Sequence, residues 1–311
     1  MHPSPAPVPP TLGDTEDHLV WIFGSSRSGS TWLLRMLAEI DAVVPIDDPH
    51  LGHHLGVWRP ISLAWGVAEH PPDLTTLDRV KRDKDSYFFS DRYRAAWAPA
   101  VRRLIVDRFD AQVAATARVP APVTVVKEPG SHVADLLLDL FPGSRFVFLL
   151  RDGRDVVDSW LAAYRDGSWA LDEGAFPVTE PGREALVRWQ SAVWTFRTDV
   201  VQRAYDAHPA ERRVLVRYED LVADPRRELR RISEVLPCDV SWAALDEVVD
   251  THAFDAVPEA DKGEGKEIRS ASPGGWRDNL TPAEHEVMHE VMGAKLAELH
   301  YLDTVARPST R

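Results

Sequence analysis

Short apolar segments alternate along the chain with longer segments whose apolar residues recur at helical spacing. Buried strands are expected where the apolar runs are unbroken, at 18–24, 122–130, 145–150 and 212–221. A turn and a helical pattern follow each of these runs, at 31–40, 131–141, 151–164 and 224–236. Strands that alternate with helices in this way predict an α/β fold with a central parallel sheet flanked by helices.

Further helices are expected at 92–117, 182–207, 241–250 and 281–300. Three helix starts have local signals: Ser131 as an N-cap, Asp224 before Pro225, and a capping box of Thr281 with Glu284. Residues 41–95 show no clean period, so we expect a loop-rich stretch with short helices there. The segments 166–182 and 253–280 are predicted to be irregular. We therefore predict a disordered leader at 1–17, one domain at 18–303 and a tail at 304–311.

Composition narrows the class of protein. The net charge of −13 argues against broad nucleic-acid binding, although a few converging arginines could still hold a small anion. A membrane span is not expected, because no apolar run approaches the roughly 20 residues that a bilayer requires. The start, MHPSPAPVPP, lacks the features of a secretory signal, and the single cysteine, Cys238, cannot form an internal disulfide. These features predict a cytoplasmic protein, and they leave open whether it forms a homodimer.

A candidate phosphate-binding loop follows the first predicted strand. Residues 24–31, GSSRSGST, have the spacing G-x4-G-x-T between a strand and a helix. Backbone N–H groups in such a loop, with a helix N-terminus behind them, cradle an anion. The position where ATP-binding loops place lysine is Ser30, and the basic residue is Arg27, inside the loop. The loop therefore predicts phosphate binding without the usual ATP–Mg arrangement; the alternatives are a plain helix-starting turn or a nucleotide kinase or GTPase with a degenerate loop.

A second candidate anion site follows the strand at 145–150. Arg151 ends that strand, and Ser159 lies eight residues later in the next helix. In parallel sheets, ligands bind outside the carboxyl ends of the strands, which is where Arg151 is expected. Its guanidinium suits a phosphate, and the serine hydroxyl adds a donor. The competing interpretation is that Arg151 pairs with Asp152 or Asp155.

Four segments in order, SSRSGSTWLL, RDGRDVVDSW, VRYEDL and IRSASPGGWRDNLT, resemble the signatures of the sulfotransferases that use 3′-phosphoadenosine 5′-phosphosulfate (PAPS). The resemblance extends from about residue 19 to 300 and identifies the chain as a bacterial member with a P-loop-like sulfotransferase fold. It implies PAPS as cosubstrate, no metal, and an acceptor hydroxyl on a small metabolite, lipid or sugar. The alternatives are a P-loop kinase or nucleotide hydrolase, and a non-catalytic nucleotide-binding protein on the same fold.

The resemblance also implies roles for individual residues. The 5′-phosphosulfate would be bound by the loop residues Arg27, Ser28, Gly29, Ser30, Thr31 and Trp32. The 3′-phosphate falls to Arg151 and Ser159, and Tyr218 would lie near the adenine, unless it only packs on the core. A late loop that closes over the 3′-phosphate maps to Arg269, seven residues before Trp276, with Ser270 and Ala271 where the family usually has Lys and Gly. Lys262 and Lys266 lie just upstream.

Sulfuryl transfer requires a general base for the acceptor proton. Many family members carry that base in a K-T-H motif, but here the matching residues are Lys127, Glu128 and Pro129, so the histidine is absent. Another branch, resembling the tyrosyl-protein sulfotransferases, uses a Glu at about the distance from the loop at which Asp47 and Asp48 lie here.

Asp48 is our first candidate for the base. The rivals are the titratable side chains nearby, namely His50, His53, His54 and Glu128. Lys127 is expected to hold the sulfuryl group or to orient Asp48, with a structural ion pair as the competing account. The acceptor pocket could be aromatic, because the chain has eleven tryptophans, although each could equally pack in the core. The candidates for it are Trp58, Trp65, Trp97, Trp169 and Trp194.

Overall fold

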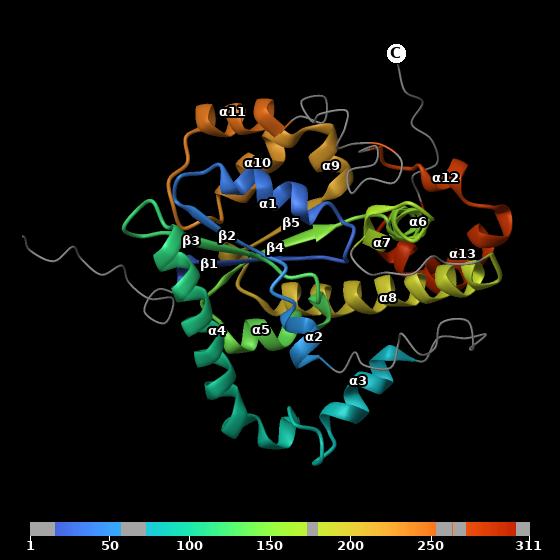
Figure 1. Cartoon of the computed structure of the whole chain (residues 1–311), viewed down its shortest axis with the longest axis horizontal. Coiled ribbons are helices and arrows are strands. Elements are labelled where there is room, and N and C mark those ends of the chain that lie inside the picture. The colour runs from blue at the N-terminus through green and yellow to red at the C-terminus, as the bar shows by residue number, and fades with distance from the viewer. Residues whose placement is uncertain (1–15, 57–72, 173–179, 253–262, 264–271, 303–311) are drawn as a thin grey trace, which may run out of the picture.

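The computed structural model describes residues 16–56, 73–172, 180–252, 263 and 272–302. Its centre is a five-stranded sheet in the order β2-β3-β1-β4-β5, and every neighbouring pair is parallel (Figure 1). The strands are β1 (Leu19–Phe23), β2 (Val43–Asp47), β3 (Val123–Lys127), β4 (Arg145–Leu150) and β5 (Arg213–Arg217). The predicted single α/β fold with a parallel sheet is confirmed.

Helices cover both faces of the sheet, as Figure 1 shows. One layer contains α1 (Ser30–Ala38), α9 (Tyr218–Ala223), α10 (Pro225–Ser233) and α11 (Trp242–His252). The other contains α4 (Arg94–Thr116), η4 (Ser131–Val133), α5 (Ala134–Leu140), α8 (Glu180–Ala207) and α13 (Pro282–Glu298). The remaining helices are η1 (Glu16–His18), α2 (Leu51–Leu55), α3 (Leu74–Arg82), η3 (Asp91–Tyr93), α6 (Gly153–Ala163), α7 (Trp169–Asp172), η5 (Ala210–Arg212) and α12 (Trp276–Asn279).

The two layers exist because both faces of each central strand are apolar. Successive side chains of a strand point to opposite faces, so β1 sends Trp21 and Phe23 into one core and Val20 and Ile22 into the other. The first core contains the aromatic residues of β4, Phe146 and Phe148, and buried residues of α8. The sheet is therefore buried on both faces. In such a sheet, ligands bind beyond the carboxyl ends of the strands.

The structure corrects several predictions. The short helices α7 and α12 lie in the stretches 166–182 and 253–280, which were expected to be irregular. Strand β2 lies inside 41–95, where no strand was expected; its Pro45 interrupts the apolar pattern and is tolerated because β2 is an edge strand that pairs only with β3. Ser131 begins the 3-10 turn η4 and does not cap α5, which starts at Ala134. Glu16 and Asp17 belong to η1, inside the expected leader, and Glu16 pairs with Arg102 at 2.7 Å.

Other local predictions are confirmed. The side chain of Asp224 accepts the backbone N–H of Arg227 at the start of α10, with Pro225 as the first helical residue. Thr281 and Glu284 form the expected capping box at the start of α13. These signals involve residues three or fewer positions apart, so the sequence contains them directly.

Candidate functional site

The phosphate loop, residues 24–31, joins β1 to α1 with two close backbone approaches. A Cβ on Gly24 would lie 2.2 Å from the carbonyl oxygen of Leu149, and one on Gly29 would lie 2.5 Å from the ring of Tyr218. Gly29 also has a φ of +88°, which glycine adopts without strain. Helix α1 starts at Ser30 and its first hydrogen bond runs from the Leu33 N–H to the Gly29 carbonyl. The N–H groups of residues 30–32 precede that bond and are placed for an anion.

The second motif meets this loop directly. The Nη1 of Arg151 donates to the carbonyl oxygen of Arg27 at 2.8 Å, and the Nε of Arg27 donates to the hydroxyl of Ser159 at 3.1 Å. The guanidinium of Arg151 stacks 4.4 Å from the ring centre of Tyr218, and that of Arg27 lies 5.1 Å from the ring centre of Trp169. Two segments more than 120 residues apart thus form one arginine-rich edge. Arg151 does not use its side chain on Asp152, which is bound by Arg154 instead.

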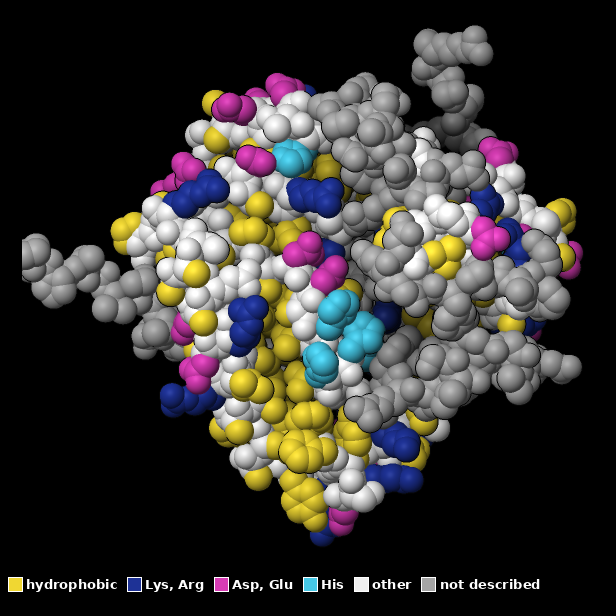
Figure 2. Space-filling model, in the orientation of Figure 1, with side chains coloured by type: hydrophobic (Ala, Val, Ile, Leu, Met, Phe, Trp, Pro, Cys, Tyr) yellow, Lys and Arg dark blue, Asp and Glu magenta, His cyan; other side chains and the backbone are white. Residues whose placement is uncertain are grey.

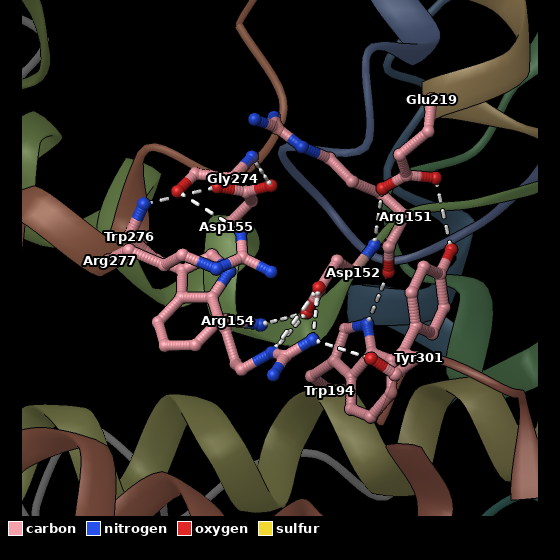
Figure 3. A network of polar contacts seen from close by, with 10 residues as sticks. All are labelled: Arg151, Asp152, Arg154, Asp155, Trp194, Glu219, Gly274, Trp276, Arg277 and Tyr301. Carbon is pink, nitrogen blue, oxygen red and sulfur yellow. Dashed lines mark hydrogen bonds and ion pairs between the residues drawn. The ribbon is translucent and has the colours of Figure 1, made fainter. Parts of the chain in front are cut away.

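A polar network behind Arg151 fixes this edge (Figure 3). The indole N–H of Trp194 donates to the carbonyl oxygen of Arg151 at 3.2 Å, and Glu219 accepts the backbone N–H of Asp152 at 2.9 Å. One turn into α6, the carboxylate of Asp155 accepts the backbone N–H groups of Gly274 and Trp276. Burial raises the pKa of Asp155, an effect that the nearby charge of Arg151 partly offsets. The network therefore couples the β4 end to the turn at 272–276.

Three buried polar atoms at this edge have no hydrogen-bond partner within the part of the chain that the structure describes. They are the hydroxyls of Ser25 and Ser28 and the Nε of Arg151. All three can donate hydrogen bonds, and they lie beside the loop N–H groups and arginines, a set of donors that suits an anion.

A second group of residues surrounds Lys127 at the end of β3. Its Nζ lies 2.7 Å from Asp47 Oδ1 and 2.9 Å from Asp48 Oδ2, and it donates to Thr31 Oγ1 at 2.8 Å. The sheet register explains the meeting, because Asp47 of β2 and Ile22 of β1 both align with Lys127. The Oδ1 of Asp48 is buried and has no partner among the described residues. This oxygen is an acceptor placed beside the phosphate loop.

Three histidines line the adjacent surface. His50 precedes α2, and His53 and His54 lie within it. Figure 2 shows histidine side chains next to acidic ones where α2 lies in Figure 1, above apolar surface that extends over α2 and α4. The Nδ1 atoms of His50 and His53 are 3.4 Å apart. Desolvation, with the charges of Arg197 and His50, lowers the pKa of His53 to about 4. His53 is thus neutral at physiological pH.

This pKa gives a pH prediction for stability. Between pH 6.5 and 4 the unfolded chain binds a proton at His53 that the folded chain does not, so the free energy of unfolding falls as the pH falls through that window. We expect His53→Gln to flatten this dependence, measured by urea unfolding at several pH values. The ring of His53 in the intact protein should stay neutral by NMR at pH 5. A ring that titrates near 6.5 contradicts the prediction.

Glu128 and Arg197 form a buried part of the site whose roles the sequence did not reveal. Glu128 is 1% exposed and accepts three backbone N–H groups, from Leu51, Gly52 and Gly130, so it is not open to an acceptor as a base would be. Arg197 of α8 donates to Ser26 Oγ at 2.8 Å, and burial lowers its pKa to about 10. The sequence did contain a sign that Arg197 is buried. It lies on the apolar side of α8, between the buried residues Trp194 and Val200.

Other predicted residues have different surroundings. The indole of Trp32 donates to the carbonyl oxygen of His252 in α11 at 3.0 Å, and its ring packs at the edge of the core on that face. Trp97 and Trp194 are buried, whereas Trp169 covers Arg27. Several candidates lie outside the described residues: Trp58, Trp65, Lys262, Lys266, Arg269, Ser270 and Ala271.

In residues 16–56, 73–172, 180–252, 263 and 272–302, no three or more His, Cys, Asp or Glu side chains are grouped as metal ligands. Within those same ranges, no helix combines the length and apolarity needed to cross a bilayer.

Fold and site define an α/β protein with an arginine-rich group at the carboxyl edge of its parallel sheet, and comparison with known proteins gives the family. The sulfotransferase family model matches residues 20–243, so the chain belongs to the sulfotransferase family and is an enzyme of that class. Human sulfotransferase 1C2 is 22% identical over 204 residues, which are 58% of this chain and 68% of the human protein.

Two further relatives agree with this assignment. The protein-tyrosine sulfotransferase of Drosophila melanogaster is 26% identical over 168 residues, which are 52% of this chain but only 30% of the fly protein. The crystal structure of mouse sulfotransferase SULT7A1 complexed with PAP superposes with a TM-score of 0.58 at 13% identity, over 94% of this chain and 89% of the mouse chain. That structural likeness confirms the sulfotransferase fold.

Proposed function

We propose that this protein transfers the sulfuryl group of PAPS to a hydroxyl of a small-molecule acceptor and releases 3′-phosphoadenosine 5′-phosphate (PAP). The observation that supports this most is that the phosphate loop and the segment after β4 are hydrogen-bonded to each other. Arg151 donates to the carbonyl oxygen of Arg27, and the side chain of Arg27 donates to Ser159. The contact brings two anion-binding groups to one edge, as a nucleotide with phosphates at both 3′ and 5′ positions requires.

The proposed roles follow from position. The loop N–H groups and the hydroxyl of Ser28 bind the 5′-phosphosulfate, and Arg151 with Ser159 bind the 3′-phosphate. Tyr218 supports Gly29 and Arg151 at the nucleotide, and Arg269 with its neighbours adds charge from the late loop. Arg27 lies between the two groups and can stabilise negative charge on the leaving phosphate.

Lys127 and Asp48 are proposed to serve the acceptor. The acceptor oxygen forms a bond to sulfur while the bond from sulfur to the phosphate oxygen breaks, and the acceptor proton passes to Asp48. Asp48 is suited to this because one carboxylate oxygen is held by Lys127 at 2.9 Å while the other has no partner among the described residues. Lys127 also contacts Thr31 of the phosphate loop, so it links the base to the sulfuryl end.

The assay for this function is PAP release from PAPS with a panel of aliphatic, phenolic and sugar hydroxyls. We expect PAP to form only when a suitable acceptor is present, with a sulfated product of matching amount. ATP or GTP turnover without PAPS turnover would instead support the kinase or hydrolase alternative. PAP binding without turnover on any acceptor would support a non-catalytic protein.

We also propose that the protein works in the cytoplasm, on the ground of its single cysteine. Whether it acts as a monomer or a homodimer can be measured by light scattering. An acceptor with a substantial apolar part is supported by the apolar surface next to the histidines in Figure 2.

A further inference from the structure

The turn that presents Asp48 has an unusual backbone. Asp48 and His50, on either side of Pro49, have φ angles of +46° and +56°. Non-glycine residues seldom adopt this left-handed region, and two so close together persist only when the surrounding structure holds them. We call residues 48–50 the base turn. What holds it bears directly on the position of the Asp48 carboxylate.

Glu128 supplies the main anchor of this turn. Its Oε2 accepts the Leu51 N–H at 2.8 Å, and its Oε1 accepts the Gly52 N–H at 3.2 Å and the Gly130 N–H at 2.6 Å. Leu51 and Gly52 directly follow the base turn. The carboxylate therefore fixes the exit of the turn to the end of β3, while its entry is fixed by the Asp48 N–H, which donates to the Lys127 carbonyl.

The packing around Glu128 leaves the turn little freedom. A Cβ on Gly52 would lie 2.1 Å from the carbonyl oxygen of Gly130, so α2 begins in direct backbone contact with the turn after Glu128. Glu128 is almost fully buried, and burial raises its pKa against the effect of its three amide donors. The charge of Glu128 in turn acts on buried Arg197, which binds Ser26 of the phosphate loop. One buried carboxylate thus lies between the base turn and the nucleotide loop.

We propose that Glu128 is a positioning residue, which holds the base turn so that the Asp48 carboxylate, whose side chain is 40% exposed, stays beside Lys127. This inference rests on the proposed function, in which Asp48 is the base. Glu128 itself takes no proton from the acceptor. It contributes by orienting a catalytic group, an effect that can reach about 10²-fold in rate for a displacement near 1 Å.

The test is Glu128→Gln, which keeps the size of the side chain. If the amide oxygen takes the Oε1 position, it still accepts the N–H groups of Gly52 and Gly130. The amide NH2 group then faces the Leu51 N–H, which loses its acceptor. We expect kcat to fall by about 10- to 100-fold while the KM for PAPS and the Kd of PAP stay within about twofold. Amide hydrogen exchange at Leu51 should accelerate, which reports the loosened turn without reference to activity.

A second variant displaces the turn while leaving the Glu128 side chain unchanged. Gly52→Ala places a methyl group against the Gly130 backbone and should lower kcat with the same unchanged PAP affinity. The matched control is Glu228→Gln. Glu228 is an equally buried glutamate on α10 that binds Arg227 and Arg231, far from the base turn, so folded Glu228→Gln should keep the wild-type kcat.

The combination with Asp48→Asn separates the two claims. If Glu128 acts through Asp48, adding Glu128→Gln to Asp48→Asn should lower kcat by less than about threefold further. Two results would overturn the positioning role while leaving Asp48 as the base. One is that the fall in kcat of the double variant equals the product of the two single-variant falls. The other is that Glu128→Gln keeps the wild-type kcat although amide exchange at Leu51 becomes faster. If Asp48→Asn alone keeps normal turnover, the base assignment fails, and the positioning role with it.

Discussion

Asp48→Asn is expected to lower kcat by about 10²–10⁴-fold, the usual contribution of a positioned base, and to leave the Kd of PAP within about twofold. Asparagine keeps the shape of the side chain and can still accept the hydrogen bond from Lys127, but it cannot take the acceptor proton. The nucleotide contacts come from the phosphate loop and Arg151, so affinity should not change. Steady-state kinetics with PAPS and calorimetry with PAP make the two measurements.

The matched control is Asp47→Asn. Asp47 binds the same lysine at 2.7 Å, but its side chain is 54% exposed, and it lacks the buried unpaired oxygen that Asp48 has among the described residues. We expect its kcat to stay within about threefold of wild type, because one carboxylate remains on Lys127. Equal losses in both variants would mean that the pair acts only through the charge on Lys127. If neither variant lost activity, His50, His53 and His54 would become the leading candidates.

The sheet and the phosphate loop could be predicted because their signals are local. A strand is signalled by an unbroken apolar run, a phosphate loop by its glycine spacing and a helix by its apolar period. Each of these signals spans only about ten residues. The same holds for the Thr281 capping box. The spacing of Arg151 and Ser159 was visible because one strand end and one helix contain both residues, and their joint binding of a 3′-phosphate stays a prediction. Strand β2 was missed because five residues with a central proline give too weak a pattern.

The contacts that join distant segments could not be predicted from spacing. Arg27 was expected at the phosphosulfate and Ser159 at the 3′-phosphate, but the fold also joins them directly by a hydrogen bond from the Nε of Arg27. Glu128 was a candidate base, yet the fold turns it inward to the backbone of a loop 76 residues away in sequence. Both outcomes depend on which strands are neighbours, and the order β2-β3-β1-β4-β5 is a property of the folded sheet rather than of any local pattern.

Arg151→Ala is expected to remove most of the preference for a 3′-phosphate. The guanidinium of Arg151 is held by the Arg27 carbonyl and the Tyr218 ring, and its Nε has no partner in the described part of the chain. Charge-assisted hydrogen bonds contribute about 1.5–3 kcal/mol each. Two of them correspond to about 10²–10⁴-fold in affinity. PAP should therefore bind wild type more tightly than AMP by about that factor, and Arg151→Ala should lose most of it.

The comparison of the two ligands makes this prediction specific. Because AMP has no 3′-phosphate, its Kd should change by less than about threefold in Arg151→Ala, whereas general damage to the loop would weaken both ligands alike. Arg154→Ala is the matched control: it removes a guanidinium three residues away that is bound to Asp152 and the Tyr301 carbonyl, so the ratio of the two Kd values should be unchanged. Ser159→Ala should reduce the ratio by about tenfold, as expected for one neutral donor. A PAP-to-AMP ratio in Arg151→Ala equal to that of wild type would place the 3′-phosphate elsewhere and remove the main support for PAPS as the cosubstrate.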